Sequence, residues 1–205
     1  MNFEIPAEIT ELLTQLDDFI ESVIKPLEEQ DDNIRFFDHR REDARTDWER
    51  GGLPNEEWEA LLFKAKRLAD EAGFYRYPHP KEYGGMDGTN LGMAVIREHL
   101  AVKGLGLHND LQNEYSIVGN NVGLLLMLRY GTEEQKEEWI DDLLHGRKGF
   151  AFGITEPEHG SDATHMETSA RRDGDEWIIN GEKTWNTGIH KAQYDMIMAR
   201  TSGKP

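Results

Sequence analysis

The sequence contains no cysteine among its 205 residues, and this absence excludes several kinds of site at once. Disulfides, thiolate metal ligands and cysteine nucleophiles all depend on the missing thiol group. A chain without disulfides suits a reducing compartment. We therefore expect the protein to be cytoplasmic.

Basic side chains are scarce, with 23 Lys and Arg against 40 Asp and Glu and a net charge of −17. Nucleic-acid binding needs clustered cations, so we expect no nucleic-acid partner. The acid excess lies mainly in residues 1–149, where we expect it to keep a helical surface in solution. Long apolar runs are missing too, and the N-terminus has no signal-peptide pattern. We expect a soluble, unprocessed protein with no membrane span.

Apolar spacings of three and four predict helices through the first three-quarters of the chain. The clearest pattern runs from Ile9 to Leu27. Further helices are predicted over residues 55–72, with Gly73 as the stop signal, and over residues 90–102, 114–129 and 132–146. Residues 122–128 are apolar nearly all round, so the fourth helix is expected to be central and buried on several sides. The fifth begins with a capping box in which Thr132 is the N-cap and Gln135 reaches back.

Two irregular stretches interrupt these helices. Residues 31–53 are charge-rich and lack a steady period, so we interpret them as a long connection that could hold a helical turn. Residues 75–85 (YRYPHPKEYGG) are marked by proline and glycine and predict a loop.

The period changes at Phe150, and short strands are predicted over residues 150–154, 168–172, 176–180, 182–186 and 192–201. Asn180-Gly181 favours a type I′ hairpin turn before the fourth of these strands. The pattern predicts an α+β protein, with an all-α N-terminal domain over residues 1–149 and a partial β-domain over residues 150–205. Open sheet edges are usually covered or paired, so we expect residues outside this chain to complete the β-domain. A small added β-region is the alternative.

The loop at residues 155–162 (TEPEHGSD) directly follows the first of these strands. Gly160 permits a ligand to approach the main chain, and the hydroxyls of Thr155 and Ser161 suit phosphates or a heterocycle. An ordinary capped loop would have the same composition. Trp185 and Thr187 are two apart on a predicted strand, so they would face the same side and could meet a flat polar ligand. On spacing alone, however, a core tryptophan and an ordinary strand threonine are the better interpretations.

Several more reactive interpretations of this loop fail on spacing. His159, His165 and Asp162 fit no metal-ligand pattern, so we expect no metal. Ser161 lies beside His159 but lacks the nucleophile elbow, and sequence neighbours seldom reach triad geometry. Glu156 is expected to be a loop carboxylate that accepts hydrogen bonds from nearby main-chain amides.

Four motifs in order resemble the acyl-CoA dehydrogenase family over nearly the whole chain. The loop GITE at residues 153–156, followed by GSD at 160–162, is similar to the family's signature loop. LRYGTEEQK at residues 128–136 resembles the helix pair that precedes the signature loop in the family. KEYGG at residues 81–85 resembles the family's early loop, and INGEKTW at residues 179–185 resembles the strand that backs the flavin. His159 and His165 stand where the family pattern usually has small residues, and Asn186 where an aliphatic residue or threonine is common.

This resemblance implies a helical N-terminal domain and the start of a middle β-domain, which together form one wall of an FAD and acyl-CoA site. Thr155 would form a hydrogen bond with the isoalloxazine, and Ser161 would lie near both the FAD pyrophosphate and the acyl-CoA substrate. Trp185 would lie against the flavin ring on the side opposite the substrate, and Thr187 would form a hydrogen bond near flavin N5. The full cofactor-binding set implied is Phe152, Ile154, Thr155, Gly160, Ser161, Trp185, Asn186 and Thr187.

The implied reaction is α,β-dehydrogenation of an acyl-CoA thioester in lipid metabolism, with hydride transfer to flavin N5. The family's catalytic base is a glutamate in a C-terminal helical domain that this chain does not contain, so no residue here is assigned a catalytic role. The resemblance also implies an electron-transferring flavoprotein as acceptor and a homo-oligomer for the complete protein. We expect this chain alone to be incomplete and inactive.

Two alternatives remain open on sequence. Acyl-CoA oxidases and some flavin monooxygenases resemble the same scaffold, and these residues do not decide oxygen access. A non-catalytic short helical module would also have this sequence pattern.

Overall fold

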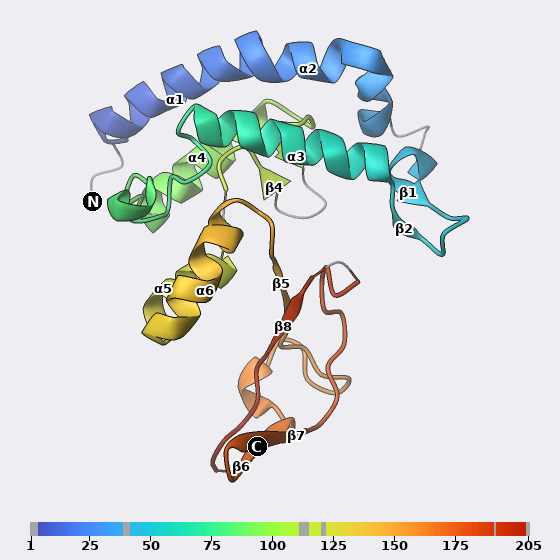
Figure 1. Cartoon of the computed structure of the whole chain (residues 1–205). Coiled ribbons are helices and arrows are strands. Elements are labelled where there is room, and N and C mark those ends of the chain that lie inside the picture. Colours follow the sequence, from blue (N-terminus) through green and yellow to red (C-terminus); the bar gives the residue numbers. More distant parts are fainter. Residues whose placement is uncertain (1–3, 39–41, 111–114, 120–121, 191, 204–205) are drawn as a thin grey trace. The chain divides into compact units, whose positions relative to one another are not determined.

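The computed structural model describes residues 4–38, 42–110, 115–119, 122–190 and 192–203 (Figure 1). The chain divides into two compact units, Met1–Asn120 and Asn121–Pro205. Among the described residues, no helix has the length and apolarity that crossing a membrane requires.

The first unit is mainly helical, as its sequence periodicity predicts. Its N-terminal helix joins α1 (Ala7–Phe19), a π-helical stretch (Ile20–Ile24) and α2 (Lys25–Glu29), and it is followed by α3 (Glu56–Glu71) and α4 (Asn90–Val102). The shorter elements are 3₁₀ helices at Gln30–Phe37, Glu42–Arg45 and Lys81–Tyr83, and the strand pairs β1 (Thr46–Asp47) with β2 (Leu53–Pro54) and β3 (Asn109–Asp110) with β4 (Tyr115–Ser116). The first three predicted helices are confirmed, and Gly73 ends α3 with a left-handed φ of 87°.

One apolar cluster forms the core of this unit. The inward stripe of the N-terminal helix meets side chains of α3 and α4. Leu16, Ile20, Ile24, Ile96 and Leu100 are fully buried. Burying such side chains is the main favourable term in folding, so this cluster fixes the helical layer.

The connection after α2 is more ordered than its irregular sequence indicates. Its first 3₁₀ helix (Gln30–Phe37) contacts Trp58 in the first turn of α3 through two aromatic rings, and Arg45, the last residue of the second 3₁₀ helix, lies over the same indole. Phe36 and Phe37 lie 5.2 Å and 5.7 Å from Trp58, measured between ring centroids. The guanidinium of Arg45 lies 4.2 Å from the centroid of the same indole. The connection therefore packs on the core through Trp58.

The fourth predicted helix starts later than expected. Glu114 lies outside the described residues, Tyr115–Ser116 forms β4, and α5 spans only Val122–Tyr130. The Ser116 hydroxyl accepts a hydrogen bond from the Val118 N–H at 3.1 Å, and such local bonds compete with helix formation. The expectation of burial on several sides is also wrong. Leu124 and Met127 are buried, but Val122 at the start of the helix is half exposed and Tyr130 at its end is exposed.

The second unit starts with α5 and α6 (Glu133–Leu144). The predicted capping box at the start of α6 is confirmed. The Gln135 N–H donates to Thr132 Oγ1 at 3.3 Å, and the Thr132 N–H donates to Gln135 Oε1 at 3.0 Å. These two bonds satisfy N–H groups that the first turn of a helix leaves without partners.

Two small sheets follow in the second unit, so a helical region followed by β-structure is confirmed. β5 (Phe150–Gly153) pairs in parallel with β8 (Tyr194–Ile197), and β6 (Ser169–Asp173) pairs antiparallel with β7 (Glu176–Asn180). Gly174 has a φ of 64° in the two-residue turn between β6 and β7. A 3₁₀ turn at Ala163–His165 precedes β6.

The predicted hairpin at Asn180-Gly181 is wrong. Asn180 is the last residue of β7, where it pairs with Ser169, and Gly181 has a φ of 147°. A type I′ turn needs left-handed φ at both central residues, which a strand residue does not have. Residues 182–186 form no strand, because main-chain and side-chain bonds draw them toward residues 154–156 instead.

Candidate functional site

The candidate site begins where the chain leaves β5. Ala151 is buried and Phe152 is 41% exposed, the alternation expected of a strand. The Met198 N–H donates to the Gly153 carbonyl at 2.9 Å, so the pairing of β5 with β8 continues one residue beyond β8. The loop that carries Thr155 therefore starts from a fixed point.

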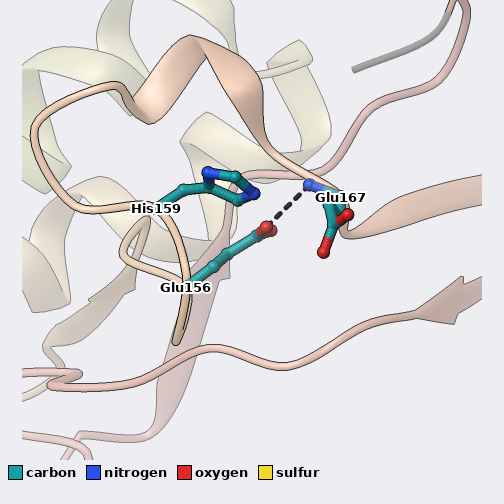
Figure 2. Close-up of side chains that lie close together, drawn as sticks. All are labelled: Glu156, His159 and Glu167. Atoms are coloured by element: carbon teal, nitrogen blue, oxygen red, sulfur yellow. Dashed lines mark hydrogen bonds between the residues drawn. The ribbon is translucent and has the colours of Figure 1, made fainter.

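Glu156 anchors this loop from inside the unit. The residue is 5% exposed, and its carboxylate accepts hydrogen bonds from the N–H of Glu167 at 2.6 Å and of Thr168 at 2.9 Å. Figure 2 shows the first of these bonds, with the Glu156 side chain reaching across to the chain that leads into β6. The main chains of Glu156 and His159 exchange hydrogen bonds of 3.0 Å and 3.2 Å. The prediction that Glu156 binds nearby amides is confirmed.

Lys183 supplies the charge that balances Glu156. Its Nζ lies 2.8 Å from Glu156 Oε1 and donates to the Ile154 carbonyl at 3.0 Å. Burial disfavours the charged carboxylate, but the hydrogen bonds from Lys183, Thr168 and Glu167 outweigh it and hold the pKa of Glu156 well below its usual range. A carboxylate held in this way stays ionised at neutral pH and is a poor proton acceptor.

A possible metal cluster at the same place is better explained by this ion pair. Glu156, His159 and Glu167 each bring one potential ligand atom to within 4.8 Å of the others (Figure 2). Both oxygens of Glu156 already accept hydrogen bonds, and the Lys183 ammonium neutralises its charge. A cation would have to displace that ammonium, so the donor set does not favour a metal.

The residues weighed as metal ligands on sequence take other partners. The rings of His159 and His165 contact each other, with centroids 4.5 Å apart and planes inclined by 44°. Asp162 Oδ1 accepts a hydrogen bond from the Thr164 hydroxyl at 2.7 Å. This arrangement organises the loop around Ser161, which is itself exposed.

Trp185 projects from the second unit instead of filling its core. The Thr184 N–H donates to the Thr155 carbonyl at 2.9 Å, so the chain runs beside the signature loop just before Trp185. Trp185 has a left-handed φ of 61°, uncommon for a residue other than glycine, and is 87% exposed. The expectation of a core tryptophan is therefore wrong. Trp185 and Thr187 also do not share a strand face, because this segment forms no strand.

Asn186 fastens the other side of this segment to β8. Its Nδ2 donates to Asp195 Oδ2 at 2.8 Å. A Cβ at Gly153 would lie 2.8 Å from that same Nδ2, so glycine is required for this close approach. Among the described residues, the Thr184 hydroxyl and Asn186 Oδ1 are buried without a hydrogen-bond partner.

The structure thus brings part of the predicted cofactor-binding set together. Ile154 and Thr155 lie beside the segment that carries Trp185 and Asn186, because their carbonyls accept hydrogen bonds from Lys183 and Thr184. Gly160 and Ser161 are exposed farther along the loop, and a Cβ at Gly160 would meet open space. Sequence reasoning missed the role of Lys183, because its partner is 27 residues away and leaves no local signal.

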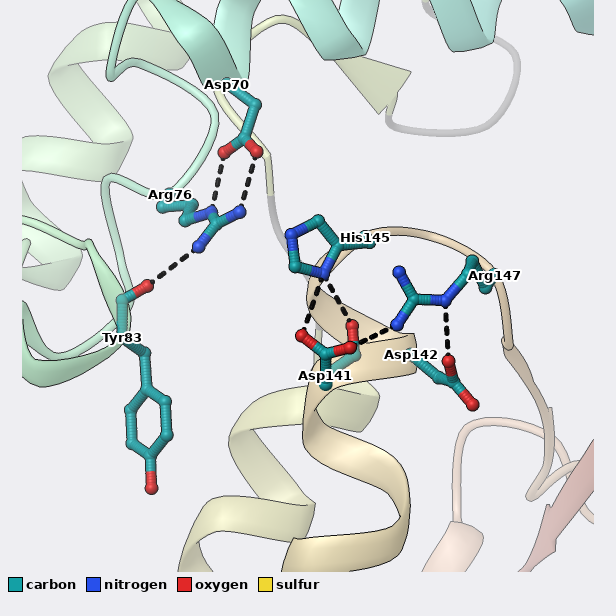
Figure 3. Close-up of polar contacts among 7 residues, drawn as sticks. All are labelled: Asp70, Arg76, Tyr83, Asp141, Asp142, His145 and Arg147. Atoms are coloured by element: carbon teal, nitrogen blue, oxygen red, sulfur yellow. Dashed lines mark hydrogen bonds and ion pairs between the residues drawn. The ribbon is translucent and has the colours of Figure 1, made fainter.

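A second polar cluster holds the early loop of the first unit. Arg76 forms a two-point ion pair with Asp70 at 2.6 Å and 2.7 Å, and it donates to the Tyr83 carbonyl at 3.1 Å (Figure 3). Figure 3 also draws Arg147, which pairs with Asp142 at 2.6 Å in the second unit. Two-point arginine pairs fix geometry as well as charge, so the KEYGG loop has a defined shape.

Comparison with known protein families matches both parts of the chain. Residues 6–147 match the family model described as "Acyl-CoA dehydrogenase, N-terminal domain", and residues 151–205 match "Acyl-CoA dehydrogenase, middle domain".

Individual relatives agree with these matches. The chain is 30% identical over 200 residues to glutaryl-CoA dehydrogenase of Desulfococcus multivorans, covering 97% of this chain and 44% of the relative. It is 32% identical over 133 residues to acyl-CoA dehydrogenase FadE12 of Mycobacterium tuberculosis, and the match covers 65% of this chain and 33% of that relative. The crystal structure of a glutaryl-CoA dehydrogenase from Mycobacterium smegmatis in complex with FADH2 superposes with a TM-score of 0.63 at 26% identity. The superposition covers 96% of this chain and 43% of that protein. The chain spans less than half the length of each of these proteins.

Proposed function

Because the chain belongs to the acyl-CoA dehydrogenase family, with that family's N-terminal and middle domains, we propose that it forms one wall of an FAD and acyl-CoA site. FAD, when bound, would supply the hydride-accepting chemistry for α,β-dehydrogenation of an acyl-CoA thioester. The chain's own residues would bind and orient the cofactor and substrate.

The observation that carries this proposal is the presentation of Trp185. Its indole is 87% exposed on a segment bonded to the signature loop at Thr155. A large apolar ring held outside the core suits a flat aromatic ligand, which would cover it. Phe152 is exposed and a Cβ at Gly160 would meet no atom within 4 Å, so neither residue is buried against its own unit, and the residues present are compatible with a flavin.

We propose individual roles within this wall. Thr155 would donate its hydroxyl to the isoalloxazine, and Thr187 would bond near N5. Ser161 would bind near the pyrophosphate and the acyl-CoA, and its exposure leaves it free to do so. The wall is completed by Phe152, Ile154, Gly160, Trp185 and Asn186.

No residue of this wall is proposed as the catalytic base. Glu156 is the nearest buried carboxylate to Thr155, but its ion pair and amide bonds keep it ionised and occupied. Its low pKa makes it unsuited to take the α-proton of a thioester. The chain alone is accordingly proposed to be inactive and to bind FAD poorly.

The remaining proposals concern the whole protein. The matched ranges support a domain boundary between residues 149 and 150, although α5 and α6 belong to the same compact unit as strands β5–β8. We propose an electron-transferring flavoprotein as acceptor, a homo-oligomeric state, and a cytoplasmic location for a chain without cysteine.

The test compares residues 1–205 with the full-length gene product. Each is titrated with FAD, and the loaded full-length protein is mixed with acyl-CoA while flavin absorbance is followed. We expect the full-length protein to retain FAD and to be bleached by substrate, and its reoxidation to be fast with an electron-transferring flavoprotein and slow in air. Rapid reoxidation by air would favour the oxidase or monooxygenase alternative. A full-length product that takes up no FAD would contradict the proposed function.

A further inference from the structure

We propose that Glu156 and Lys183 form a positioning pair, which sets the main chain at Thr155 and Trp185 in the arrangement that receives the flavin. This inference deepens the proposed function and rests on it. It assigns a role to two residues outside the cofactor-binding set itself.

The bonds of Lys183 enclose Thr155 on both sides. The single ammonium reaches the carbonyl of Ile154 at 3.0 Å and the carboxylate of Glu156 at 2.8 Å. The next residue, Thr184, donates its N–H to the Thr155 carbonyl at 2.9 Å. Three consecutive residues of the loop are thus held by two consecutive residues of the segment that leads to Trp185.

Glu156 joins a third segment to the same point. Its two oxygens accept hydrogen bonds from the N–H groups of Glu167 and Thr168, directly before β6. The side chains of Glu156 and Lys183 are 4% and 6% exposed, so water competes little for these bonds. One buried ion pair therefore fixes the relative positions of residues 154–156, 167–168 and 183–184.

The backbone at Trp185 indicates what this arrangement is for. A left-handed residue other than glycine persists only where its surroundings determine its conformation. Trp185 lies between two such constraints, since Lys183 is bonded to the loop and Asn186 is bonded to Asp195 of β8. The conformation does not bury the indole, which is almost fully exposed, so core packing does not explain it. Presentation of the indole to a ligand explains the left-handed conformation of Trp185.

The test uses Lys183→Met in the full-length gene product, which keeps the apolar stem and removes both bonds of the ammonium. Lys148→Met is the matched control, because Lys148 pairs with Asp142 of α6 at 2.9 Å in the same unit, instead of with the loop, and is a quarter exposed. Hydrogen–deuterium exchange of peptides covering residues 153–168, 174–180 and 183–188 is measured without FAD. FAD affinity and the visible spectrum of bound flavin are measured separately.

We expect Lys183→Met to speed amide exchange in residues 153–168 and 183–188 by about tenfold or more, as loss of a charge-assisted hydrogen bond allows. Exchange in residues 174–180, which form the turn after β6 and strand β7, should stay unchanged. Lys183→Met should lower FAD affinity by about tenfold and shift the visible spectrum of the bound flavin. Lys148→Met should change FAD affinity by no more than about twofold and leave the flavin spectrum unchanged.

Unchanged exchange in both segments would overturn the positioning role, as would a uniform rise that includes residues 174–180. If Lys183→Met does not fold, the double variant Glu156→Gln with Lys183→Met removes the unpaired buried charge and is measured in the same way. Unsubstituted protein that takes up no FAD would contradict the proposed function, while the exchange measurement still decides whether the pair orders the loop. Normal FAD affinity and spectrum in a variant with faster exchange would overturn the link to the flavin.

Discussion

Trp139 of α6 stacks on Tyr194 of β8, with ring centroids 4.4 Å apart and planes inclined by 28°. Phe150 of β5 completes the cluster, 5.5 Å from Trp139 and 5.7 Å from Tyr194. Two strands alone have little independent stability, so this aromatic cluster supports the β5–β8 pair through α6. The start of the candidate site therefore depends on a helix that contributes no residue to it.

Replacing Trp139 should weaken the second unit. Trp139→Ala removes both ring contacts and is expected to lower the free energy of unfolding by about 2–3 kcal/mol. Trp139→Phe should cost less than about 1 kcal/mol, because the indole N–H is buried without a hydrogen-bond partner among the described residues. Denaturant unfolding followed by circular dichroism measures both. Trp177→Ala, at a half-exposed tryptophan on β7, is the control, and an equal loss there would contradict the prediction.

The cap of α6 provides a second test. Thr132→Ala removes the acceptor for the Gln135 N–H and should lower the free energy of unfolding by about 1 kcal/mol. Thr132→Ser keeps a hydroxyl at the N-cap and should retain most of that stability. Thermal unfolding of the two variants side by side measures the difference, and equal melting temperatures would show that the capping box contributes nothing.

The contrast between Thr132 and Trp185 shows which features sequence can predict. The capping box needs only residues three positions apart, and the helical stripes repeat within a few turns, so both leave a local pattern. Trp185 departs from the predicted strand because Lys183 pairs with a carboxylate 27 residues earlier. The late start of α5 has a similar cause, since hydrogen bonds around Ser116 outweigh the apolar pattern that follows. The motifs point to the residues proposed for the site, but the exposure and main-chain geometry of these residues depend on contacts between distant segments.

His79 should make the first unit sensitive to acid. It is 1% exposed, and both ring nitrogens are buried without a hydrogen-bond partner among the described residues. Burial, with the nearby positive charge of Arg76, lowers the pKa of His79 from 6.5 to about 4. The unfolded chain binds the proton more readily, so stability is full above pH 6.5 and falls as the pH drops toward 4.

The expected loss from His79 is about 2 kcal/mol between pH 7 and pH 5. His79→Phe removes the titrating group, so its free energy of unfolding should change less between these two pH values than that of the unsubstituted chain. Parallel pH profiles for the His79 variant and the unsubstituted chain would contradict the assignment.

Gly92 lets α4 approach the Tyr77 side chain closely. A Cβ at Gly92 would collide with the Tyr77 hydroxyl and lie 3.0 Å from both Tyr77 Cζ and Ile9 Cδ1. Tyr77 is buried, so its ring has little room to move. Alanine is normally the better helix former by about 1 kcal/mol, but here the overlap should reverse that gain and cost about 2–3 kcal/mol.

The double variant Gly92→Ala with Tyr77→Phe isolates this collision. Removing the hydroxyl takes away the closest overlapping atom, so the second substitution should restore about 1 kcal/mol or more that Gly92→Ala loses. Gly149→Ala is the control, because a Cβ there meets no atom within 4 Å and its φ is not left-handed. Denaturant unfolding of the four proteins gives the coupling energy. Strictly additive effects of the two substitutions would show that α4 yields to the new methyl group and that Gly92 is not required by Tyr77.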